Sequence, residues 1–130
     1  MRGHAFIAEM SASAFDQYAV QFALEHMQPL DEAAAARVRH DAHPDVLHVR
    51  LEGASVKIDQ IRKVIAEASQ KPYEGGRRVI CIHNAGSMTQ QAQNALLKSL
   101  EEPLDCNTYL LLCSSVEQLL PTVRSRCVLI

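Results

Sequence analysis

Cys81 and His83 lie two positions apart in the run RVICIH (78–83), a spacing that suggests nucleophilic catalysis. A thiolate beside an imidazole can attack a carbonyl group after the imidazole has taken the proton of the thiol. Cys113, in the apolar run TYLLLCSS (108–115), is a second candidate thiol. Cysteines inside apolar strands have raised pKa values and little access to solvent. The pattern therefore favours buried, reduced thiols over a thiol enzyme.

Metal binding has only a weak signal in this chain. The cysteines have no CxxC spacing, and the histidines in the first half lack the regular i,i+4 pairing of helical metal sites. We therefore predict neither a metal nor another cofactor. The side chains considered for this role are Cys81, Cys106, Cys113, Cys127, His26, His40, His43 and His48.

Two arginines, Arg124 and Arg126, lie in the stretch LLPTVRSRC (119–127). A guanidinium can bind phosphate oxygens through two parallel hydrogen bonds. An arginine at the end of a short helix can instead stabilise the carbonyl end of that helix. Spacing alone favours this structural role for Arg126 and leaves the phosphate role open.

Strands and helices that could position these residues alternate along the chain. Apolar runs indicate strands, and apolar residues at helical spacing indicate helices. Pro29 should end the first helix. We expect strands at 4–8, 46–53, 78–83, 108–115 and 127–130, helices at 11–27, 31–39, 56–69 and 90–102, and a short helix or turn at 116–126.

This alternation predicts an α/β fold with a mostly parallel sheet. The 130 residues, 48% of them hydrophobic, suit a single domain over 1–130. A net charge of −2 does not indicate a dedicated nucleic-acid binder, which usually has a strong net positive charge. Any DNA contact must therefore be local. The sequence has neither a membrane-spanning apolar run nor the pattern of a signal peptide, and we expect a cytoplasmic protein without a membrane partner.

Five stretches carry a resemblance to a known family. They are HPD (43–45), IDQIR (58–62), YEGGRRVICI (73–82), AQNALLKSLEEP (92–103) and LLPTVRSRC (119–127). Their order and spacing resemble the ATPase-fold domain of bacterial DNA polymerase III clamp-loader subunits, most closely its delta prime branch.

The resemblance implies an AAA+ domain, a P-loop NTPase-like three-layer α/β/α sandwich with a five-stranded sheet of order 5-1-4-3-2. It also implies a place in the DNA polymerase III holoenzyme, in a hetero-oligomeric ring with gamma/tau-type ATPase subunits and a delta subunit. That ring loads the sliding clamp onto primed DNA. The family's helical lid and collar do not follow Ile130, which leaves open a piece of a longer protein or a naturally short relative.

The ATP site of the family looks degenerate in this chain. A phosphate loop needs bare backbone and a lysine, and the central strand must end in acids that serve Mg²⁺ and water. In the loop at 9–17 the glycine positions fall on Met10, Ser13 and Phe15, the lysine on Asp16 and the magnesium-binding hydroxyl on Gln17. The strand at 79–84 ends in His83 and Asn84. We therefore expect no bound nucleotide and no ATPase activity of the isolated chain.

The Ser125-Arg126-Cys127 triplet matches the family's SRC motif. The resemblance implies that Arg126 is an arginine finger acting in trans on ATP of a neighbouring subunit, while Ser125 and Cys127 shape the turn into the last strand. Two alternatives stay open, an active ATPase with an unconventional phosphate loop and a standalone protein-interaction module.

Two further groups of charged residues have more than one interpretation. Glu101 and Glu102 end a helix where acids are unfavourable for the helix dipole, which suggests an intersubunit or structural contact or else a solvated end. The basic residues that could touch duplex phosphates in an assembled ring are Lys57, Arg62, Lys63, Arg77 and Arg78.

Overall fold

The computed structural model describes residues 4–27 and 30–130, which form a five-stranded parallel sheet. Its order is β2-β3-β4-β1-β5, and every neighbouring pair is parallel. This confirms the α/β fold and the order 5-1-4-3-2. The strands are β1 (His4–Glu9), β2 (Val46–Val49), β3 (Arg78–Ile82), β4 (Asn107–Cys113) and β5 (Val128–Leu129).

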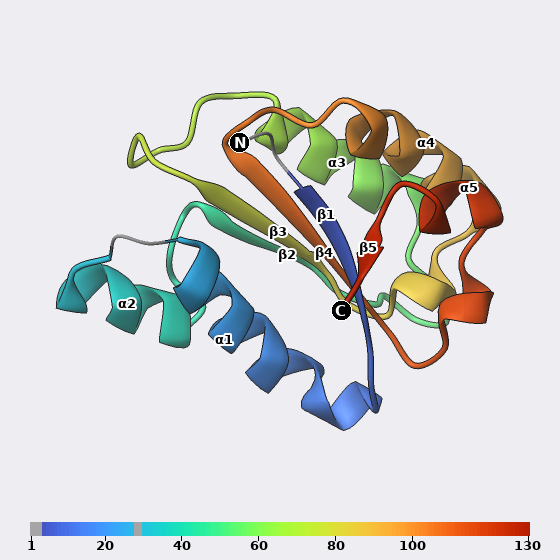
Figure 1. Ribbon diagram of the computed structural model, residues 1–130, viewed down its shortest axis with the longest axis horizontal. Helices are drawn as coiled ribbons and strands as arrows, with labels where there is room; N and C mark the ends of the chain where they lie inside the picture. Colours follow the sequence, from blue (N-terminus) through green and yellow to red (C-terminus); the bar gives the residue numbers. More distant parts are fainter. Residues whose placement is uncertain (1–3, 28–29) are drawn as a thin grey trace.

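Helices cover both faces of the sheet and complete three layers, with α1 and α2 on one face and α3, α4 and α5 on the other (Figure 1). Expected and observed helices agree, although Pro29 lies outside the described residues. The helices are α1 (Phe15–His26), α2 (Glu32–Arg39), α3 (Ile58–Ala68), α4 (Gln90–Glu101) and α5 (Pro121–Arg124), with single 3-10 turns η1 (Ala12–Ala14), η2 (Ala85–Ser87) and η3 (Val116–Gln118).

The inner strand β3 is buried on both faces, as its continuous apolar sequence predicts. Val79 and Cys81 pack against the α1 and α2 layer, whereas Ile80 and Ile82 pack against α3 and α4. Successive side chains of a strand point to opposite faces, so one strand contributes to two hydrophobic cores. These cores hold the carboxyl ends of the strands at one edge of the sheet.

Strand β2 is shorter than the expected 46–53. The chain turns after it through Gly53, which has a φ of 68°, and residues 52 and 55 face each other across an antiparallel bridge. A positive φ is readily adopted by glycine, which has no Cβ. The turn leads the chain to α3 and leaves Arg50 just beyond the end of β2.

Candidate functional site

The carboxyl edge of the sheet is where parallel α/β proteins bind ligands. After β1, the N–H of Met10 donates to Cys113 O at 3.0 Å, and η1 leads directly into α1. Met10 is partly buried, whereas Ser13 and Gln17 are exposed. Phe15, the first residue of α1, is 3% exposed and packs its ring edgewise against His83, with the ring centroids 6.4 Å apart. A buried aromatic side chain thus lies at a position where we predicted a glycine of the family's phosphate loop.

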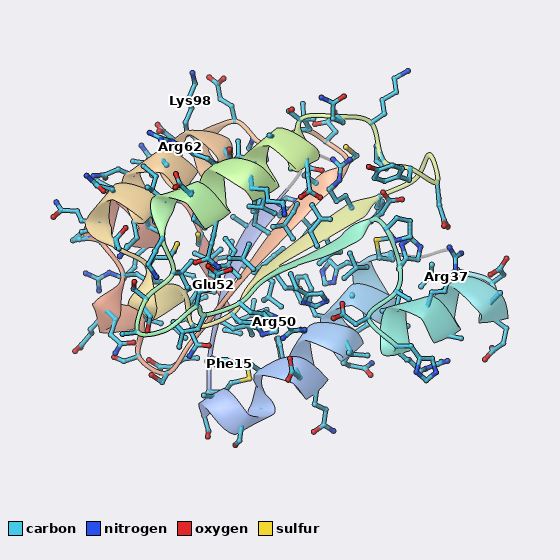
Figure 2. The ribbon with its side chains drawn as sticks, turned by 180° about the vertical axis from the view of Figure 1, so that it is seen from behind. Phe15, Arg37, Arg50, Glu52, Arg62 and Lys98 are labelled. Carbon is cyan, nitrogen blue, oxygen red and sulfur yellow. The ribbon has the colours of Figure 1, made fainter. Side chains whose placement is uncertain are left out.

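Asp16 forms an ion pair with Arg50 in the first turn of α1. Arg50 Nη1 donates to Asp16 Oδ1 at 2.6 Å, and this hydrogen bond lowers the pKa of the Asp16 carboxyl. Figure 2 shows Arg50 beyond the end of β2 and Phe15 at the start of α1. The Asp16 carboxylate, at the position predicted for the lysine, is therefore bound by a cation of the same chain.

His83 directly follows β3, and its Nε2 lies 2.9 Å from Nδ1 of His48. His48 Nε2 lies 3.3 Å from Asp41 Oδ1, so we assign the His48 proton to Nε2 and leave Nδ1 to accept from His83 Nε2–H. Burial lowers the pKa of His83 to about 4 and also lowers that of His48. Both rings are therefore neutral at pH 7.

Asp41 joins the ion pair to the histidine pair. Its Oδ2 lies 3.5 Å from Arg50 Nη2 while Oδ1 faces His48. Asp41 has a φ of 55°, and so does Asn84, the partly buried residue after His83. Left-handed backbone at non-glycine residues is uncommon and is found at tight turns and functional sites. We call the five side chains of this connected set the polar cluster, namely Asp16, Asp41, His48, Arg50 and His83.

The polar cluster is poorly suited to bind a triphosphate. Two carboxylates against one guanidinium and two neutral imidazoles leave one net negative charge, which repels phosphate oxygens. Among residues 4–27 and 30–130, no group of three or more histidine, cysteine or carboxylate side chains is arranged to hold a metal ion. The side chains of the polar cluster instead pair with one another.

Three of the thiols, those of Cys81, Cys113 and Cys127, are poor nucleophiles. Cys81 is fully buried, and burial raises its pKa to about 12. Burial also raises the pKa of Cys113, and that of Cys127 to about 12. A thiol with such a pKa has almost no thiolate at pH 7.

The SRC residues follow α5 at the molecular surface. Ser125 ends α5, and its hydroxyl donates to Thr122 O at 2.9 Å. Arg126 Nη1 donates to Ser125 Oγ at 3.2 Å, and Arg126 Nη2 lies 3.6 Å from Glu101 Oε2. The guanidinium thus contacts Ser125, the C-cap residue of α5, and Glu101 at the end of α4. Its side chain is 47% exposed, and Cys127 beside it is partly buried.

Helix α4 also contacts the start of the segment 120–127, which holds α5 and the SRC residues. Gln93 is 4% exposed, and its Oε1 accepts from the N–H of Leu120 at 2.7 Å. Leu120 is the N-cap residue of α5, so a buried amide on α4 holds the helix that leads to Arg126. The two stretches 92–103 and 119–127 are in direct contact.

The loop at 71–77 is held by the HPD stretch. Asp45 is 1% exposed, and its carboxylate accepts from the N–H groups of Tyr73 at 2.7 Å and Glu74 at 2.9 Å. Glu74 pairs in turn with Arg37, and its Oε1 lies 3.3 Å from His43 Nε2. Two of the stretches that carry the resemblance, 43–45 and 73–82, are therefore in direct contact.

Arg78 cannot contact DNA in this structure, and our assignment of it to the basic residues facing phosphate was wrong. The side chain is 2% exposed. It donates from Nη1 to Ala68 O at 2.9 Å and Asn107 Oδ1 at 3.0 Å, and from Nη2 to Gln70 O at 2.8 Å. Its charge thus stabilises the carbonyl end of α3.

Sequence reasoning missed Asp41, Arg50 and Gln93 and considered His48 only as a weak metal ligand. A signal for Arg50 and His83 was present, because both directly follow strands of one parallel sheet, and the carboxyl ends of such strands meet at one edge. Gln93 had no such signal, since a glutamine among apolar positions of a helix does not reveal its partner.

A family model described as "DNA polymerase III, delta subunit" matches residues 3–130. Curated proteins named DNA polymerase III subunit delta' also match. The protein of Pseudomonas aeruginosa is 41% identical over 88 residues, which are 66% of this chain and 27% of that protein. The protein of Bacillus subtilis is 36% identical over 91 residues, which are 70% of this chain and 28% of that protein. The chain belongs to the DNA polymerase III delta' family.

A solved structure extends the similarity of this delta' family member to nearly the whole chain. A gamma subunit-related protein of Thermotoga maritima superposes with a TM-score of 0.76 at 26% identity, covering 99% of this chain and 40% of that one. The alignments span about a quarter of the length of the curated delta' relatives. In the part of the chain that the structure describes, no helix has the length and apolar character to cross a membrane.

Proposed function

We propose that this chain acts as the ATPase-fold domain of a non-hydrolysing delta' subunit in a clamp loader and supplies Arg126 in trans to ATP of a neighbouring subunit. The observation that carries the proposal is the contrast between two sites. Arg126 is half exposed in an intact SRC triplet, whereas the phosphate-loop region of the same chain is occupied by Phe15 and by the Asp16–Arg50 pair.

The chemistry of phosphoryl transfer explains why such a division is useful. Charge on the γ-phosphate oxygens in the transition state is stabilised by an arginine from a neighbouring subunit, with an effect of about 10³ to 10⁵ on the rate. A subunit without ATP of its own can still provide this arginine, so its activity appears only in the assembled ring.

The partners proposed for the whole protein are gamma/tau-type ATPase subunits and a delta subunit, working on primed DNA in the replicating polymerase assembly. Exposed basic side chains support a local contact with DNA phosphates. They are Lys57, Arg62, Lys63 and Arg77. In this role we place the protein in the cytoplasm.

The experiment compares ATP turnover of the reconstituted clamp loader containing wild type, Arg126→Ala or Arg39→Ala in the longest natural form of the protein. Arg39 on α2 is a matched control, because its side chain is 49% exposed and also pairs with a glutamate. We expect Arg126→Ala to abolish turnover at the site it faces while the ring still forms. Unchanged turnover in an intact ring would make Arg126 structural, and failure of wild type to form a ring would contradict the clamp-loader role itself.

A further inference from the structure

The position of Glu101 is unfavourable for the helix that carries it. Glu101 is the last residue of α4 and Glu102 is its C-cap, so two carboxylates lie at the negative end of the helix dipole. Helix propensity offers no reason for an acid at this place. A tertiary contact of one of the two side chains can offer one.

That contact is with the SRC arginine. Glu101 Oε2 lies 3.6 Å from Arg126 Nη2, while Arg126 Nη1 donates to Ser125 Oγ at 3.2 Å. The Ser125 hydroxyl is directed to Thr122 O, so its oxygen presents a lone pair to the guanidinium. Both terminal nitrogens of Arg126 are therefore held by groups of its own chain.

The contact between Arg126 and Glu101 is weak enough for another anion to replace the carboxylate. The side chains of Arg126 and Glu101 are 47% and 44% exposed. Ion pairs at such surfaces change equilibria by only a few-fold and are screened by salt. A phosphate group carries more negative charge than one carboxylate and can accept two parallel hydrogen bonds from an arginine, whereas Glu101 makes one contact with Arg126 at 3.6 Å. A phosphate that comes within reach therefore competes well for this guanidinium.

We propose that Glu101 is a positioning residue that holds Arg126 in a resting position on its own subunit until the γ-phosphate of a neighbour's ATP replaces the carboxylate. This inference rests on the proposed function. No covalent step is involved, since the guanidinium exchanges one anionic partner for another. The consequence is a finger that engages less often when the ring is only loosely closed.

The test compares Glu101→Gln with Glu102→Gln in the reconstituted clamp loader. The two variants lose the same charge at the same helix end, but the resolved ion pair involves Glu101. Without DNA we expect Glu101→Gln to raise basal turnover about two- to fivefold at low salt, with an unchanged KM for ATP, whereas Glu102→Gln keeps the wild-type rate. The gain should vanish between about 0.05 M and about 0.5 M salt, because screening already weakens the wild-type pair.

Two results would overturn this inference. Equal rates for Glu101→Gln and Glu102→Gln at low salt would show that the carboxylate does not restrain the arginine. A lower rate for Glu101→Gln would show that Glu101 orients the engaged finger instead of holding it back.

The double variant Glu101→Gln/Arg126→Ala separates this inference from the proposed function. We expect it to match Arg126→Ala, because the effect of Glu101 passes through Arg126. If Arg126→Ala lowers turnover but Glu101→Gln behaves like Glu102→Gln, only the resting position is wrong. If Arg126→Ala itself has no effect, the trans finger is wrong as well.

Discussion

The side-chain oxygen of Gln93 accepts a hydrogen bond from the backbone N–H of Leu120 at 2.7 Å. The two residues are 27 positions apart, and the bond joins the buried side of α4 to the first residue before α5. Since Glu101 on the same helix contacts Arg126, α4 holds both ends of the segment that carries the SRC residues. A displacement of α4 would therefore move Arg126.

Replacing Gln93 with methionine should loosen this connection. The change keeps the length of the side chain but leaves the Leu120 N–H without its acceptor, which costs about 1–3 kcal/mol in the free energy of unfolding. Gln91→Met, at an exposed position of the same helix, is the control and should stay within about 0.5 kcal/mol of wild type. Urea unfolding measures both, and equal losses for the two variants would refute the role of the hydrogen bond.

Arg78 should be among the most sensitive charged residues for stability. Arg78→Met removes the side-chain donor to the Gln70 carbonyl and to Asn107 Oδ1, and leaves the Ala68 carbonyl with Asn107 Nδ2 as its side-chain donor. We expect a loss of about 2–4 kcal/mol in the free energy of unfolding. Arg77→Met changes an exposed neighbour and should alter stability by less than about 0.5 kcal/mol. If thermal or urea unfolding gave similar values for the two, the three hydrogen bonds of Arg78 would contribute little.

The fold could be predicted because its signals are local. Apolar runs such as TYLLLC and helical spacings such as Ile58, Ile61 and Ile65 appear within one element, and the resemblance supplied the strand order. The contacts of the site could not be predicted, since they join residues remote in the chain. Asp16 and Arg50 are 34 positions apart, and His48 and His83 are 35 positions apart.

The wrong assignment of Arg78 to the DNA-facing residues has a physical reason. Arg77 and Arg78 are adjacent arginines that the sequence does not distinguish. Only Arg78 begins β3, and its side chain is buried. Whether a basic residue faces solvent depends on the register of the strand, which composition does not give. In contrast, the prediction that Asp16 stands at the family's lysine position requires only the alignment of one strand and one helix.

Restoring a lysine at position 16 should not restore nucleotide binding. Asp16→Lys supplies the charge, but Phe15 still fills a position next to it and the new cation faces Arg50. We expect no saturation with a fluorescent ATP analogue up to about 1 mM, which corresponds to about −4 kcal/mol. Asp16→Asn is the control for the loss of the carboxylate alone. Saturable binding by the wild-type chain would instead support the alternative of an active ATPase.

The histidine pair should make the stability of the protein depend on pH. Burial lowers the pKa of His83 to about 4 in the folded chain, whereas an unfolded histidine has a pKa of about 6.5. Between these values the unfolded chain binds a proton that the folded chain does not, so the free energy of unfolding falls as the pH falls. The free energy of unfolding has its full value above about pH 6.5. By about pH 4 it has fallen by at most about 3 kcal/mol.

Urea unfolding at a series of pH values between about 4 and about 7.5 tests this expectation. His83→Gln keeps a hydrogen-bonding side chain beside His48 but cannot be protonated in this range, so its stability should fall less steeply with decreasing pH than that of wild type. His40→Gln changes an exposed residue outside the polar cluster and should keep the wild-type slope. The comparison depends on slopes, so it stands even if His83→Gln is less stable at every pH. Identical slopes for wild type and His83→Gln would mean that His83 takes up its proton equally in the folded and unfolded chains, and the neutral pair would then be the wrong description of this edge of the sheet.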